Sequence, residues 1–458
     1  MKKILCALLV VLFMLTMLPE GSGGWNAPAK AAGPTVVQIA AGYHRSFALL
    51  SDGSLYAWGS FSYGESDVET NSYMKTPVKI GSGFTAIATG GAHLLALKGN
   101  TLFAWGNNYR GQLGAGNLVF SYTLVQIGTG YTAIAAGYCH TLALKGDTLY
   151  AWGDNKSGQL GDASIKYYKN KPLQIGTGYT AIAAGSVHSL ALMGDALYAW
   201  GRNDNGQLGD GTLTRRYTPT QIGTGYTAIA AGSAHCLALT GSDLYTWGLN
   251  GYGQLGDGTN ISKNTPVQIG TGYTAIAAGD SHSLSLKGNT LYAWGSNGYG
   301  QLGDGTGKNS RTLVEIGTGY TAISAGYYHS LALMGGALYA WGYNKTGALG
   351  DGTLTNRKTP TRITFFDNLP SPAPVLATGV KITPPNVTMI VGESITLKAT
   401  VSPDNATNKD VTWSSGDKTK ATVSSAGVVT AIRQGTVIIT VKTKNGKTAK
   451  CVVKVLSN

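Results

Sequence analysis

Histidine is the residue type in this chain whose spacing most strongly suggests chemistry. Six histidines recur at almost constant intervals, each twelve residues before a tryptophan: His93, His140, His188, His235, His282 and His329. A ring of imidazoles could hold a metal ion or relay protons. Equivalent positions on non-adjacent repeats are, however, too far apart to share one ion at Zn–N distances of about 2.0–2.1 Å. We therefore interpret the histidines as structural side chains that tie a strand to its turn, and Arg45 at the same position of the first repeat agrees with this.

Acidic residues give little support for catalysis. Calcium takes six to eight oxygen ligands, and each Gly-Asp-Gly turn supplies one aspartate. The repeats hold only Glu65, Glu69 and Glu315, so a paired-carboxylate hydrolase site has few candidates. We expect no catalytic residue, no metal and no cofactor, and we keep a polysaccharide-acting enzyme only as a third alternative. The turn aspartates are Asp210, Asp257, Asp304 and Asp351.

Seven copies of one unit lie between about Val36 and Thr364. Their tryptophans, each followed by glycine, are 47, 47, 48, 47, 47 and 47 residues apart: Trp58, Trp105, Trp152, Trp200, Trp247, Trp294 and Trp341. Each unit shows four short strand patterns with Gly-rich turns. Four strands per unit and seven units predict an all-β fold with a seven-bladed β-propeller. Residues 359–364 repeat an outer strand that the first unit lacks, so we expect one blade to be shared between the two ends.

The N-terminal residues 1–32 have the pattern of a signal peptide. Lys2 and Lys3 precede an apolar run over 4–18, and small residues follow that suit cleavage after Ala31 or Ala32. We expect the mature chain to be secreted, or associated with the cell surface or cell wall. Three cysteines then remain, an odd number at wide spacing that excludes a disulfide-stapled fold.

The repeat resembles the regulator of chromosome condensation repeat. Ala184–Leu192 reads AGSVHSLAL and Gly206–Gly209 reads GQLG, and the likeness covers about 330 residues. The resemblance implies a propeller over residues 33–366. The family includes nucleotide exchange factors, ligase modules and secreted bacterial propellers, so it implies no single function. Because exchange on a nuclear GTPase does not fit a signal peptide, the nearer analogy is with propeller-type β-lactamase inhibitory proteins, whose loops grip an enzyme.

A second module follows a Pro-rich linker at 367–375. Residues 376–458 alternate apolar and polar positions, which predicts a small β-sandwich. Motifs such as Val411-Thr-Trp-Ser-Ser415 resemble the bacterial immunoglobulin-like group 2 domain. This tail holds eleven Lys and Arg against four Asp and Glu. For a secreted chain, an anionic cell-envelope polymer is a better expected partner than nucleic acid.

Two loop sets vary between the repeats, one before the histidine and one after the Trp-Gly pair. If they share a face, that face is rich in tyrosine, which suits protein or glycan binding. We expect a monomeric binding or adhesion protein that uses this face, and the alternative is a secreted inhibitor of another enzyme. The candidate ligand-binding residues are Tyr43, Tyr109, Arg110, Tyr138, Arg202, Tyr252, Tyr299, Tyr327, Tyr328 and Tyr343.

Overall fold

The computed structural model describes residues 33–61, 73–370, 375–404 and 406–457. The chain divides into two compact units, Met1–Pro370 and Ser371–Asn458, which are described separately. The expected signal peptide and the middle of the expected linker lie outside the described residues. Within the described ranges, no helix has the length and apolar character needed to cross a membrane.

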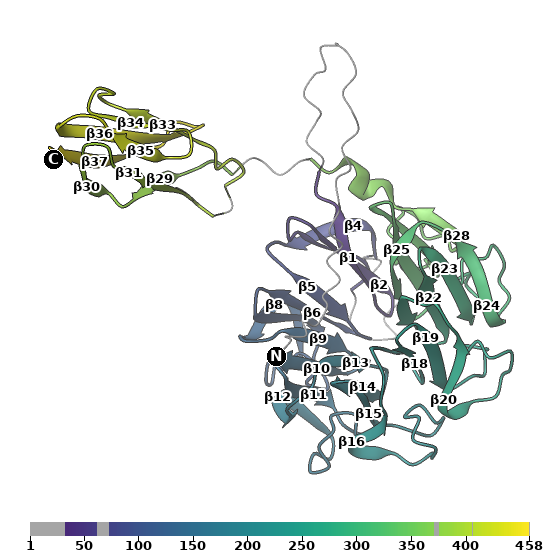
Figure 1. Ribbon diagram of the computed structural model, residues 1–458. Helices are drawn as coiled ribbons and strands as arrows, with labels where there is room; N and C mark the ends of the chain where they lie inside the picture. The colour runs from purple at the N-terminus through teal and green to yellow at the C-terminus, as the bar shows by residue number, and fades with distance from the viewer. Residues whose placement is uncertain (1–32, 62–72, 371–374, 405, 458) are drawn as a thin grey trace. The chain divides into compact units, whose positions relative to one another are not determined.

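The first unit is a propeller of seven four-stranded antiparallel sheets, as predicted (Figure 1). We letter the blades A to G in chain order, and in each blade the strands run from the innermost to the outermost along the chain. Blades A to C contain β1 (Val36–Ala41), β2 (Arg45–Leu50), β3 (Leu55–Ser60), β4 (Tyr73–Gly81), β5 (Ala86–Thr89), β6 (His93–Lys98), β7 (Thr101–Asn107), β8 (Phe120–Gly128), β9 (Ala133–Ala136), β10 (His140–Lys145), β11 (Thr148–Asp154) and β12 (Tyr168–Gly176). Blades D to G contain β13 (Ala181–Ala184), β14 (His188–Met193), β15 (Ala196–Gly201), β16 (Arg216–Gly223), β17 (Ala228–Ala231), β18 (His235–Thr240), β19 (Asp243–Gly248), β20 (Lys263–Gly270), β21 (Ala275–Ala278), β22 (His282–Lys287), β23 (Thr290–Gly295), β24 (Ser310–Gly317), β25 (Tyr320–Ala325), β26 (His329–Met334), β27 (Ala337–Gly342) and β28 (Arg357–Arg362).

Residue size along the blade explains how the sheets pack. The inner strands are short and Ala-rich, as in β17, so that seven of them can converge on one axis. Leu237 and Leu244 of the next two strands are fully buried between blades, and so is Trp247. Gly241 makes the hairpin between β18 and β19 at a φ of +59°, which L side chains rarely adopt. Each blade buries its apolar faces against both neighbours.

The repeat histidine links two blades, which corrects our expectation that it ties a strand to its own turn. His235 Nε2 of blade E lies 2.9 Å from Ser283 Oγ of blade F. Ser283 Oγ donates to the Gln254 carbonyl of blade E at 2.9 Å, and Trp294 Nε1 donates to the same oxygen at 2.8 Å. Because the serine proton goes to that carbonyl, Nε2 carries the imidazole proton and donates to Ser283. The equivalent pairs are His93–Thr141, His140–Ser189, His188–Cys236, His282–Ser330 and His329–Ser46.

The junction between blades A and B is built differently. Arg45 replaces the histidine, and Leu94 replaces the hydroxyl-bearing residue that would receive its proton. The Arg45 guanidinium lies 5.6 Å from the centre of the Phe61 ring, and Phe61 stacks on Trp105 at 5.0 Å. Both partners of the hydrogen bond between blades are therefore absent from this junction. Leu94 cannot accept a hydrogen bond, but with arginine in place of histidine there is no buried imidazole N–H that needs an acceptor.

The ring closes by packing between blades A and G, and no blade is shared between the ends of the chain. The expectation of a shared blade was wrong, because β28 pairs with β27 of its own blade and β3 pairs with β4. Closure instead uses the Tyr327 N–H, which donates to the Gly42 carbonyl at 3.0 Å. It also uses the 3-10 helix η1 (Thr364–Asn368), in which Phe366 packs on Tyr56 and Trp58. Helix η1 includes the first two residues of the expected linker.

The second unit is a small β-sandwich, as predicted for the Ig-like module. One sheet has the order β30-β37-β36-β33 and another β31-β35-β34, while β29 pairs with β32. Ile439, Cys451 and Val453 are fully buried in its core. The strands are β29 (Gly379–Thr383), β30 (Asn386–Ile390), β31 (Ser394–Thr396), β32 (Lys398–Ser402), β33 (Val411–Ser415), β34 (Ala421–Val423), β35 (Val428–Ala431), β36 (Gly435–Thr443) and β37 (Thr448–Leu456).

Candidate functional site

The two variable loop sets lie at the same end of the propeller and touch each other. One set joins the first and second strands of each blade, and the other follows the third strand. Backbone hydrogen bonds connect them within a blade: the Asn107 N–H donates to the Ala92 carbonyl, and the Tyr343 N–H donates to the Tyr328 carbonyl, both at 2.9 Å. Both sets therefore belong to one surface, which we call the loop face.

Aromatic residues of both loop sets form a continuous group across blades A, C, F and G. Tyr43 and Tyr327 have ring centres 4.2 Å apart, and Tyr327 and Tyr328 are 4.4 Å apart. Tyr328 contacts Tyr299 at 5.0 Å, and Tyr299 contacts Tyr343 at 5.1 Å. The aromatic cluster comprises Tyr43, His44, Tyr138, Tyr299, Tyr327, Tyr328 and Tyr343.

The other four candidate residues lie on the loops of blades B, D and E, outside this cluster. Tyr109 and Tyr252 are about half exposed. Arg110 Nε is 4.0 Å from an Asp154 carboxylate oxygen. Arg202 Nε donates to Asp204 at 2.8 Å, so its charge is already paired within the loop. The structure thus brings six of the ten candidates together.

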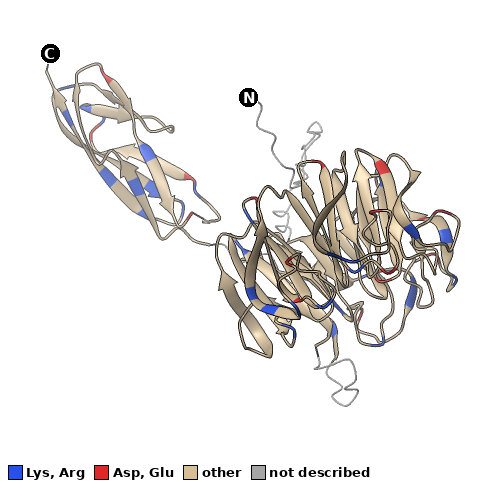
Figure 2. Ribbon diagram, turned by 90° about the horizontal axis from the view of Figure 1, so that it is seen from below, with Lys and Arg blue, Asp and Glu red and all other residues tan. Residues whose placement is uncertain are grey.

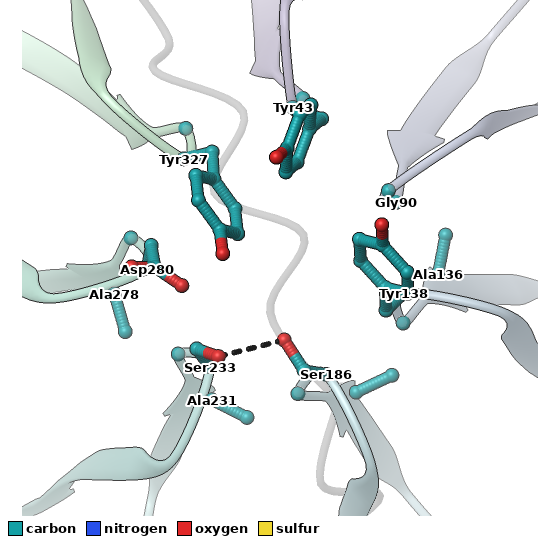
Figure 3. A pocket seen from close by; sticks show the side chains of 18 of the residues that line it. Tyr43, Gly90, Ala136, Tyr138, Ser186, Ala231, Ser233, Ala278, Asp280 and Tyr327 are labelled. Atoms are coloured by element: carbon teal, nitrogen blue, oxygen red, sulfur yellow. Dashed lines mark hydrogen bonds between the residues drawn. The ribbon is translucent and has the colours of Figure 1, made fainter. Parts of the chain in front are cut away.

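A small depression of about 100 Å³ opens at the centre of the loop face (Figure 3). Below it lies a space of about 280 Å³ lined mainly by alanine and isoleucine of the inner strands. Glycine precedes each rim residue because the blades approach closely there: a Cβ on Gly232 would lie 2.3 Å from His235 and 2.5 Å from the Gly279 carbonyl. The rim, which we call the channel mouth, comprises Tyr43, Gly91, Tyr138, Ser186, Ser233, Asp280 and Tyr327.

The channel mouth is chemically uneven, as Figure 3 shows. Tyr43, Tyr138 and Tyr327 form one side of the rim. On the other side, Ser186 Oγ donates to Ser233 Oγ at 2.9 Å. Asp280 lies between Ser233 and Tyr327. One rim segment is therefore aromatic, one carries hydroxyls, and one carries a carboxylate.

Asp280 is a site residue that our sequence reasoning did not select. Ser281 Oγ donates to its carboxylate at 2.9 Å, and the hydroxyls of Ser233 and Tyr327 also face it. Burial raises the pKa of Asp280 above its usual value. Burial and the nearby carboxylate raise the pKa of the Tyr327 phenol as well. The signal was in the sequence, because Asp280 is the acidic residue at a repeat position that otherwise carries Tyr, Gly or Ser.

The repeat histidines and turn aspartates such as Asp351 form hydrogen bonds within the propeller. Burial lowers the pKa of His235 to about 3, so its imidazole is neutral at physiological pH. Asp351 accepts hydrogen bonds from Thr353 and Arg357, which hold its carboxyl pKa below the usual range. Among the described residues, no group of three or more His, Cys, Asp or Glu side chains is placed to hold a metal ion.

Comparisons with known proteins agree with this architecture. The RCC1-like domain matches residues 124–381, and the regulator of chromosome condensation (RCC1) repeat matches 36–65 and 100–144. The bacterial Ig-like domain (group 2) matches 376–453. The crystal structure of Prp20p from Saccharomyces cerevisiae is 27% identical, with a TM-score of 0.61, over 69% of this chain and 87% of that one. Human WBSCR16 is 21% identical, also with a TM-score of 0.61, over 72% and 96%, which shows the fold alone.

Curated relatives match over a short stretch. An Ig-like virion protein of Serratia phage KSP90 is 51% identical over 85 residues, which is 18% of this chain and 33% of that protein. The kappa-carrageenase of Pseudoalteromonas carrageenovora is 49% identical over 82 residues, 18% of this chain and 21% of the enzyme. The chain thus spans about a third or less of the length of these relatives. Because the RCC1-like domain covers more than half of the chain and the seven blades are in place, the protein belongs to the RCC1-like domain family and carries a C-terminal bacterial Ig-like domain.

Proposed function

We propose that this protein is a secreted or cell-surface binding protein that holds a protein ligand against the loop face of its propeller. The aromatic cluster is the observation that carries the proposal. Tyrosine offers a large contact area and a hydroxyl at little cost in side-chain entropy, and it is enriched where binding energy concentrates. Tyr299 is 40% exposed, and Tyr327, Tyr328 and Tyr343 are partly exposed beside it.

The relatives favour a protein ligand over a glycan. The structure of Prp20p is reported with its binding to Gsp1p and histones, and a second structure shows the same protein, yeast RCC1 (Prp20), bound to Kap60. An RCC1-like propeller can therefore serve as a protein-binding module, which supports a binding role for this one. The rings of the aromatic cluster also meet at steep angles, such as 89° between Tyr327 and Tyr328. They form an uneven surface that suits protein side chains better than a flat platform for sugar rings.

Secretion is part of the proposal and rests on the basic and apolar pattern of residues 1–32. A second proposed contact is between the Ig-like unit and an anionic cell-envelope polymer. Lys442, Lys450 and Lys454 are exposed and alternate with buried residues along the neighbouring strands β36 and β37, so they share the outward face of this sheet. Figure 2 shows basic residues on the strands of this unit. Such a row of charges attracts a polyanion in a salt-sensitive way.

Replacing Tyr327 and Tyr328 tests the proposal directly. The equivalent loop of blade E carries Ser233 and Ala234, so the double variant Tyr327→Ser/Tyr328→Ala gives blade G a loop that the fold already accommodates. We expect the full chain to capture a protein from culture or envelope fractions, and the double variant to lose that capture.

Tyr122→Ser is the matched control, because Tyr122 is 69% exposed on β8, the outermost strand of blade B, and does not belong to the aromatic cluster. Equal capture by the double variant and the control would contradict the assignment of the loop face. Capture of a glycan, and not of a protein, would favour adhesion to carbohydrate. A one-to-one complex that abolishes the activity of a captured enzyme would identify an inhibitor.

A further inference from the structure

The channel mouth combines a carboxylate with aromatic rings in a depression that one side chain can fill. Seven equivalent positions, one from each blade, surround this point, and Asp280 supplies the negative charge among them.

The Asp280 carboxylate has hydroxyl neighbours but no cation. Ser281 donates to it at 2.9 Å, and Ser233 and Tyr327 also present hydroxyls to it. Some of the other propeller carboxylates are paired with cations, as Asp210 is with Arg216 and Asp351 with Arg357, both at 2.7 Å. In the part of the chain that the structure describes, no ion pair includes Asp280. A partly buried carboxylate that lacks a cation is stabilised by any cation that a ligand brings to it.

The aromatic side of the mouth adds a second attraction for positive charge. Tyr43 and Tyr327 lie with their ring centres 4.2 Å apart, and Tyr138 is 6.0 Å from Tyr43. The faces of tyrosine rings attract ammonium and guanidinium groups by about 0.5–2 kcal/mol, and their apolar carbons pack against an aliphatic stem.

The size and lining of the space favour a slender group. The mouth measures about 100 Å³, and the space below it is walled mainly by the side chains of Ala and Ile, such as those of Ala231, Ala278 and Ile323. An opening of this size admits one extended side chain more easily than a whole sugar ring. A lysine or arginine side chain needs polar partners only at its tip, and the rim supplies them.

We infer that the channel mouth receives a single lysine or arginine side chain of a protein ligand, with its charged group on Asp280 and its stem against Tyr327 and Tyr43. The inference rests on the proposed function, because it names the chemical group that the loop face recognises. It makes Asp280 the residue that sets specificity, while the outer aromatic cluster supplies contact area.

Short labelled peptides test the inference on the full chain. One peptide has a single arginine flanked by glycines, and its partner has citrulline, which keeps the shape but removes the charge. We expect saturable binding of the arginine peptide by fluorescence anisotropy, and binding of the citrulline peptide weaker by about tenfold or more. Asp280→Asn should weaken arginine binding to the same level, while it retains hydrogen-bond acceptance from Ser281.

Asp147→Asn is the control, because Asp147 lies in the β10–β11 hairpin at the other end of the strands and is exposed. Equal binding of the two peptides, no binding of either, or an unchanged affinity in Asp280→Asn would overturn the inference. The proposed function is tested separately by capture of the protein ligand. If capture depends on Tyr327 and Tyr328 but not on Asp280, the binding role stands and the basic-side-chain inference fails.

Discussion

At the residue scale, the repeat histidines act as neutral donors between blades. Burial lowers the pKa of His140 and His282 to about 3, well below the usual value of 6.5. The periodicity of the histidines could be read from the sequence, and so could their structural role. Their partners could not, because Ser283 lies 48 residues after His235 and meets it only when two blades pack together.

These histidines make the free energy of unfolding of the propeller depend on pH. The folded imidazoles stay neutral down to about pH 3–4, whereas in the unfolded chain they take up protons below about pH 6.5. The unfolded state therefore binds more protons in this window, and stability falls as pH is lowered, by up to about 1.4 kcal/mol per pH unit for each histidine.

We expect the thermal unfolding midpoint of the full chain to drop steadily between pH 7 and pH 5. The turn carboxylates such as Asp351, whose pKa is lowered, add their own loss of stability only at more acidic pH. A midpoint that stays constant from pH 7 to pH 5 would contradict the buried, neutral histidines.

At the element scale, the repeat predicted the strands well but not the way the ring closes. A periodic sequence can be divided before or after the outer strand without changing its period, so spacing alone did not say whether β28 completes blade A or blade G. The antiparallel pairing of β27 with β28, in which Gly342 lies opposite Arg357, assigns β28 to blade G. The seam then relies on contacts between blades A and G, among them the packing of Phe366 from helix η1 on Tyr56 and Trp58.

Truncating Phe366 should weaken this seam. Its ring is 9% exposed and lies 5.4 Å from Tyr56 and 6.0 Å from Trp58. We expect Phe366→Ala to lower the free energy of unfolding of the full chain by about 3 kcal/mol, measured by chemical denaturation. Phe365→Ala is the neighbouring control with a smaller expected effect, since Phe365 is 37% exposed. Equal effects of the two variants would show that η1 does not hold the ring closed.

At the scale of the whole molecule, the Ig-like unit holds eleven Lys and Arg against four Asp and Glu, and the loop face of the propeller carries the aromatic cluster. The candidate site was partly predictable, because variation among otherwise constant repeats marked the loops. Which candidates meet was not predictable, because Tyr43 and Tyr327 come from opposite ends of the array and become neighbours only when the ring closes.

The charge of the Ig-like unit leads to a prediction about attachment. We expect the full chain to sediment with isolated cell walls at low salt and to be released as salt increases. Lys442→Glu/Lys450→Glu/Lys454→Glu should abolish this sedimentation. The control Lys398→Glu/Lys409→Glu/Lys418→Glu reverses as many charges, on exposed lysines outside β36 and β37. If both triple variants behave alike, net charge and not the β36–β37 face is responsible.

The central claim is that the aromatic cluster on the loop face forms the binding surface for a protein ligand. Its most direct test is the affinity of the full chain for the captured protein, compared between Tyr327→Ser/Tyr328→Ala and Tyr122→Ser. We predict that the dissociation constant rises at least about tenfold in the double variant, as for residues at the centre of an interface, and stays unchanged in the control. An unchanged dissociation constant in the double variant, with its fold intact, would contradict the claim.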